Sequence, residues 1–163
     1  MTKWVIRVGL LVALCAVAFW LWRILVPTQE QIIRKRLAQI AQVASFSGKE
    51  SPLAKLGNAQ QLANFCAPDA EIAVEIPGHA QAITGQEEIR QAALAARAAA
   101  SSVQIEFLDV NVAVDPGKQS AIAHLTAKGR VQGEQVVEEL KFTFRKVEGK
   151  WLIQRVERVK TLS

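Results

Sequence analysis

The sequence predicts an α+β fold, in which an N-terminal transmembrane helix precedes a curved antiparallel sheet with three helices covering one of its faces. Two observations predict this fold. An apolar stretch opens the chain, and helical periodicity then gives way to long runs of strand periodicity separated by turn residues. The chain has 163 residues, enough for one domain and an appendage. We therefore expect an anchor over residues 1–27 and a single domain over residues 28–163.

The apolar stretch runs from residue 4 to residue 26. As a helix it would be about 34 Å long, which exceeds the roughly 30 Å of a bilayer's hydrocarbon core. Basic residues flank its uncharged centre, and tryptophans, which favour membrane interfaces, stand near both ends. The residues expected at the two interfaces are Trp4, Arg7, Trp20, Trp22 and Arg23. The sequence thus predicts a single-pass signal anchor, with the lipid bilayer as its first partner.

The processing and the orientation of this segment have alternatives. Residues 16–18 have the small-x-small form of a signal-peptidase site, but cleavage after Ala18 would leave an apolar tail that still seeks a membrane. Basic residues on both sides of the span leave the orientation undecided. A short N-terminal tail before a signal anchor usually stays in the cytoplasm. We therefore favour a domain on the outer side of a bacterial cytoplasmic (inner) membrane.

The net charge of +5 is confined to the N-terminal part of the chain. Of the 20 Lys and Arg residues, six precede residue 46, and of the 15 Asp and Glu residues, one does. The remaining chain therefore carries 14 basic and 14 acidic side chains and is neutral. A neutral domain with 6% aromatic residues is not typical of nucleic-acid binding, so we expect no nucleic-acid partner.

Three helices are expected in the domain. The first spans residues 28–45, the second begins at Pro52, and the third spans residues 84–100. The first and the third open with Thr and have Gln or Glu three residues later, which is the pattern of a capping box. The apolar stripe expected to bury the second helix consists of Leu53, Leu56, Leu62, Ala63 and Cys66.

Strand periodicity occurs over residues 69–76 and in four longer runs after the third helix. Pro77 and Gly78 end the first strand, and hairpin turns containing glycine separate the others. The four later strands are expected at residues 103–114, 120–131, 135–147 and 151–160. In the first of these the apolar alternation changes phase near Phe107, which predicts a β-bulge and a bent sheet.

This order of elements resembles the SnoaL-like branch of the nuclear transport factor 2-like superfamily over residues 28–162. The segments that carry the resemblance are residues 69–72, 85–89 and 142–153. It implies a cone-shaped half-barrel with a pocket between sheet and helices, and often a dimer through the outer face of the sheet. The fold hosts isomerases, dehydratases and cyclases as well as non-catalytic binding domains, so it does not specify an activity.

The candidates for a catalytic role are weak. Enzymes of the resembling family use tyrosine donors or paired His and Asp residues, and this chain contains no tyrosine. Three pocket candidates remain: His124 in mid-strand, Asp109 at the predicted bulge, and Glu138, which is in phase with the apolar residues of its strand. Glu138 could act as a base or pair with Arg155. Solvated cross-strand charges are the common alternative for such residues.

No motif for a metal or a cofactor occurs in the sequence, so we expect neither. The two histidines lie 45 positions apart and only one cysteine falls in the domain, which leaves no metal-ligand spacing. Glycine-rich phosphate loops and nucleophile elbows are also missing from the sequence.

Two functions follow from these observations. The first is a non-catalytic binding or assembly module at the cell envelope, with a membrane protein or a second copy of the chain as partner. The alternative is a membrane-anchored enzyme or carrier, of isomerase, dehydratase or cyclase type, acting on a small apolar molecule in the cone. A cone filled by Phe142, Phe144 and Trp151 would favour the first, and converging ionisable groups in an open cavity would favour the second.

Overall fold

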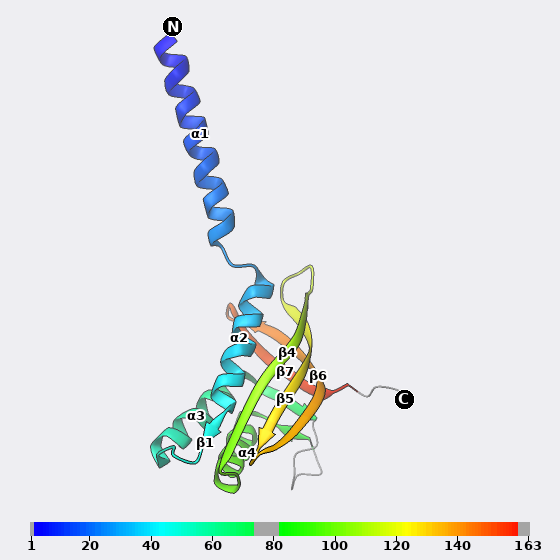
Figure 1. The fold of residues 1–163 in the computed structure, drawn as a ribbon. Helices are drawn as coiled ribbons and strands as arrows, with labels where there is room; N and C mark the ends of the chain where they lie inside the picture. The colour runs from blue at the N-terminus through cyan, green and yellow to red at the C-terminus, as the bar shows by residue number, and fades with distance from the viewer. Residues whose placement is uncertain (1, 74–81, 160–163) are drawn as a thin grey trace.

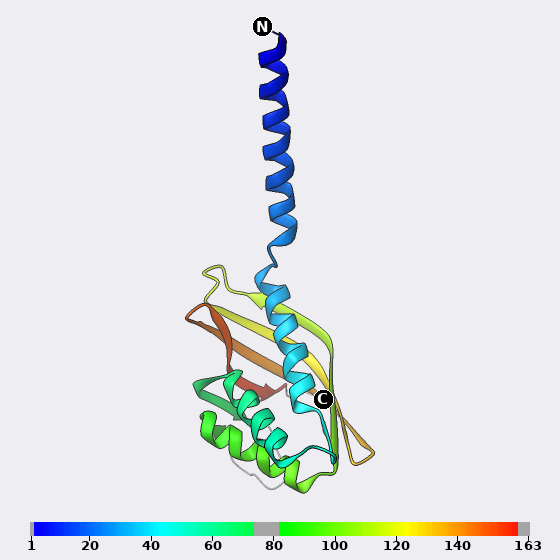
Figure 2. The ribbon, with the colours of Figure 1, turned by 90° about the vertical axis from the view of Figure 1, so that its left-hand side faces the viewer.

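The computed structural model describes residues 2–73 and 82–159 of the chain (Figure 1). It contains a helix α1, Thr2–Leu25, that projects away from a domain of helices and strands (Figures 1 and 2). Large apolar side chains of α1, such as Phe19 and Trp20, are exposed. Over the residues that the structure describes, no helix meets both the length and the apolar character that a membrane crossing requires. The anchor over residues 1–27 stays a prediction from the sequence.

Seven strands within the described residues form one curled sheet. Their bounds are β1 Phe46–Ser47, β2 Cys66–Ala73, β3 Ile83–Thr84, β4 Ser102–Val114, β5 Ser120–Val131, β6 Glu134–Val147 and β7 Lys150–Arg158. The order across the sheet is β1-β4-β5-β6-β7-β2-β3. The four long strands and their hairpins confirm the prediction. The expected purely antiparallel sheet is wrong, however, because β2 runs parallel to β7.

The parallel pair arises from the path of the chain. After β2 the chain forms β3, the helix at residues 86–99 and the β4–β7 meander, whose last strand, β7, lies beside β2. The alternation of apolar and polar residues predicts a strand but not which strand lies next to it, so it could not predict this pairing. β2 also begins at Cys66, three residues before the expected start. Residues 74–76 and the turn at Pro77 and Gly78 lie outside the described residues.

Three helices lie on the inner, concave face of the sheet: α2 Gln29–Ala44, α3 Pro52–Asn64 and α4 Gln86–Ala99 (Figure 2). The capping box of α2 is confirmed, since Thr28 Oγ1 accepts a hydrogen bond from Gln31 N–H. The capping box predicted for α4 is wrong. Its N-cap is Gly85, with φ of 86°, and Glu88 accepts a hydrogen bond from the backbone N–H of Thr84.

The apolar stripe predicted for α3 is also wrong in its first turns. Leu53 and Leu56 are 79% and 50% exposed, whereas Ala59 and Ala63 are fully buried. The small alanine face of α3 packs against α4, which has an alanine-rich face of its own. Close helix packing selects small residues at the contact, so a search for large apolar side chains picked the wrong face.

The predicted bulge is confirmed at Asp109. The register between β4 and β5 shifts between Leu108 and Asn111, and Asp109 adopts a left-handed conformation with φ of 51°. Asp is among the residues that tolerate this conformation best after glycine. Beyond the bulge the inward-facing positions of β4 change from odd to even numbers, so that Val112 packs in the core.

The conformation of Asp109 leads to a testable prediction. We expect Asp109→Gly to keep or raise the stability of the chain, and Asp109→Val to lower it by about 1–2 kcal/mol, since a β-branched residue is strained at positive φ. The measurement is thermal unfolding of both variants beside the unchanged chain. Equal stability of the two variants would contradict the assigned backbone conformation.

Candidate functional site

The inner face of the sheet is the place where the sequence predicts a pocket. The three aromatic side chains that would fill this pocket, Phe142, Phe144 and Trp151, are all buried. The Phe142 ring stacks on Phe144 at 6.2 Å between centroids, and Phe107 meets Phe142 edge-on at 5.6 Å. The Trp151 Nε1–H donates a 2.9 Å hydrogen bond to Gln29 Oε1, so α2 covers this part of the sheet.

Glu138 lies on the inner face, as its phase predicts. It faces Ala127 of the neighbouring strand, and its carboxylate forms an ion pair with Arg158 at 2.5 Å. The predicted pairing of Glu138 with Arg155 is wrong. The register of β6 and β7 shifts between Thr143 and Phe144, which moves Arg155 to the outer face and leaves Arg158 on the inner face. A bulge therefore decides which arginine meets Glu138.

The other two candidates lie elsewhere. His124 is exposed on the outer face, where its backbone pairs with Asn111 and Lys141. Asp109 is exposed at the bulge. The structure therefore does not bring Glu138, His124 and Asp109 together, and they form no common constellation of acid, base and donor.

The outer face of the sheet is strongly charged. Lys141 binds Glu157 at 2.8 Å, and Arg155 lies 3.1 Å from Glu157. Hydrogen bonding to Lys141 lowers the pKa of Glu157, as hydrogen bonds from Gln154 and Arg145 lower that of Asp69. Exposed ion pairs of this kind contribute little stability each, but they make the outer face polar and hydrated.

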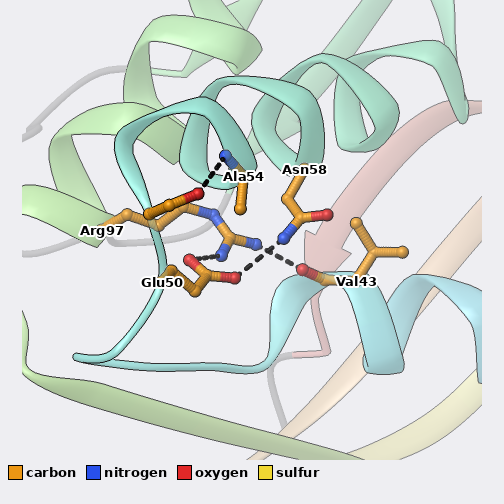
Figure 3. Close-up of polar contacts among 6 residues, drawn as sticks. Val43, Glu50, Ala54, Asn58 and Arg97 are labelled. Atoms are coloured by element: carbon orange, nitrogen blue, oxygen red, sulfur yellow. Dashed lines mark hydrogen bonds and ion pairs between the residues drawn. The ribbon is translucent and has the colours of Figure 1, made fainter.

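The sequence did not lead us to predict one buried polar cluster, which is drawn in Figure 3. The Arg97 guanidinium of α4, 2% exposed, forms a 2.6 Å ion pair with Glu50 and donates to the backbone oxygen of Val43. Asn58 of α3 also donates to Glu50, at 2.8 Å. A sequence signal existed, since Arg97 lies eight residues after the buried Ile89 and thus on the inward face of its helix.

This cluster connects α4 to α3, to the end of α2 and to the loop that holds Glu50. The charge of Arg97 is paired with the Glu50 carboxylate. The Arg97 guanidinium also lies over the Phe46 ring, 4.8 Å from the ring centroid. Cys66, the one cysteine of the domain, is buried, and burial raises the pKa of its thiol to about 11, which keeps it protonated and unreactive at neutral pH. Within the described residues no three metal-binding side chains come together.

Comparison with solved structures identifies the fold. A nuclear transport factor 2-like protein with a cystatin-like fold from Novosphingobium aromaticivorans superposes with a TM-score of 0.56 at 21% identity, covering 88% of this chain and 86% of that one. A nuclear transport factor 2-like protein of unknown function from Pseudomonas putida gives 0.60 at 12% identity, covering 80% and 85%. A candidate dehydratase of the same family from Streptomyces avermitilis gives 0.58 at 14% identity, covering 81% and 96%.

At these identities the comparisons show the fold alone, a nuclear transport factor 2-like, cystatin-like half-barrel. No family model matches the sequence, and no curated protein matches it. The function must therefore be argued from the residues of this chain.

Proposed function

We propose that this chain is a non-catalytic binding or assembly module, tethered to the bacterial cytoplasmic membrane by residues 1–27. The observation that supports the proposal is the burial of Phe142, Phe144 and Trp151 on the inner face of the half-barrel. An enzyme of this fold needs ionisable groups that converge on an open cavity. Here Glu138 is neutralised by Arg158, and His124 lies on the other face.

The membrane tether in this proposal rests on the sequence of residues 4–26. Its 23 residues contain two charges, Arg7 and Arg23, near opposite ends. Tethering confines a domain to a plane and raises its effective concentration for other membrane components. A membrane protein, or a second copy of the chain through the outer face of the sheet, is the partner that such a module would take.

Fractionation of cells tests the tether. The full chain, with alkaline phosphatase fused after residue 163, is compared with the same fusion lacking residues 1–27. We expect the first to stay in the membrane pellet after an alkaline carbonate wash and to be enzymatically active, which requires export, and the second to be soluble and inactive. A full-length fusion that the wash releases would refute the anchor, and an anchored but inactive fusion would reverse the orientation.

Native mass spectrometry of the full chain, purified from cells in a mild detergent, tests the module itself. We expect no stoichiometric small molecule, and we expect a photo-crosslinking residue on the domain surface to give a discrete protein adduct in cells. A bound apolar molecule that is lost on Glu138→Leu would overturn the proposal and establish the alternative, an anchored enzyme or carrier acting in the cone.

A further inference from the structure

A polar groove lies between α2 and α3, which contact each other. Its volume is about 510 Å³, within the range of roughly 300–1,000 Å³ that is usual for ligand pockets. The lining residues are Gln39, Gln42, Val43, Asn58, Gln61 and Phe65. None of the described residues that line it is acidic. None of these residues belongs to a strand of the sheet.

Amide side chains dominate the groove. The Asn58 side chain donates a hydrogen bond to Glu50. The side chains of Gln39, Gln42 and Gln61 are exposed, and none of them makes a hydrogen bond to another described residue. Each amide offers donors and an acceptor together. This combination matches the alternating N–H and C=O groups of an extended peptide backbone.

A cation that has no ion-pair partner among the described residues adjoins the groove. The Arg36 guanidinium lies over the Phe65 ring, 5.0 Å from its centroid, and its Nε is buried without a hydrogen-bond partner. No described carboxylate lies within ion-pair distance of Arg36, which distinguishes it from Arg97 and Arg158. Burial lowers the pKa of Arg36, because partial desolvation disfavours the charged guanidinium. A desolvated guanidinium binds a carboxylate more strongly than a hydrated one.

We propose that the α2–α3 groove binds an extended peptide segment of a partner protein, with an Asp or Glu carboxylate of that segment paired to Arg36. The glutamine side chains on the two helices hydrogen-bond the backbone of the segment. The inference rests on the proposed assembly function, to which it adds the chemistry of the partner.

The test uses the full chain in detergent, labelled with ¹⁵N in its Gln and Asn side chains, and two blocked pentapeptides. Both peptides are alanine except for a central residue, which is glutamate in one and glutamine in the other. We expect saturable NMR shifts of the Gln39, Gln42 and Gln61 side-chain amides, with the acidic peptide binding roughly tenfold more tightly because its hydrogen bond to Arg36 is charge-assisted.

Two variants assign the effect. Arg36→Met should remove the preference for the acidic peptide, while Lys35→Met, which makes the same charge change at an exposed position next to it, should keep that preference. If Arg36→Met does not fold, the double variant Gln42→Ala with Gln61→Ala provides a second measurement, since both residues are exposed. This variant should weaken the binding of both peptides equally.

Three results would overturn the inference: no saturable shift in the groove, equal binding of the two peptides, or a preference that survives Arg36→Met. In each case the protein adduct expected in cells from the proposed function would be unaffected. Failure of the groove and failure of the assembly function are therefore distinguishable.

Discussion

Replacing Arg97 with methionine should lower the free energy of unfolding by about 3–5 kcal/mol. Methionine fills much of the same space, but it leaves the Glu50 carboxylate without its ion pair and the Val43 carbonyl without its donor. Removing one partner of a buried ion pair leaves the other charge unpaired and poorly hydrated, and this destabilises the protein strongly. The measurement is thermal unfolding of the purified full chain, followed by circular dichroism.

A matched control lies on the same helix. Arg90 forms an ion pair with Glu87 at 2.5 Å, but the Glu87 side chain is 64% exposed. Arg90→Met should therefore cost much less stability than Arg97→Met, because exposed ion pairs contribute little. Removing both charges of the buried pair, in Arg97→Met with Glu50→Gln, should restore part of the lost stability. A cost for Arg97→Met no larger than that for Arg90→Met would contradict the structure of the cluster.

The second large effect is expected at Phe144. Its side chain is fully buried on the inner face, in contact with Phe142. Phe144→Ala should lower the free energy of unfolding by about 3–5 kcal/mol, because it loses apolar burial and leaves a cavity that the rigid sheet cannot close. Chemical denaturation of the variant measures this loss.

Val137 of the same strand supplies the comparison. It is 54% exposed on the outer face, so Val137→Ala should change the stability by about 0.5 kcal/mol or less. If Phe144→Ala proved as mild as Val137→Ala, the half-barrel would have room in its centre for a ligand. The proposal of a non-catalytic module would then lose the observation on which it rests.

Local features of the fold could be predicted from the sequence. The capping box at Thr28 and the proline that opens α3 involve residues within one helical turn. The hairpin turns have positive φ at Gly133 and Gly149, where glycine is best tolerated, and the bulge at Asp109 follows from a change of alternation within one strand. Each depends on contacts between residues close in the chain, so the pattern of residue types is sufficient.

The candidate sites were decided by the tertiary structure. Whether Arg155 or Arg158 meets Glu138 depends on a register shift between two strands, and one extra residue exchanges the two faces. The Arg97–Glu50 pair joins residues 47 positions apart, and Arg36 reaches Phe65 from another helix. Sequence periodicity places a residue on a face of its own element. Which face of another element it meets depends on packing across the whole domain, and that determines whether a charge is paired, buried or free to bind.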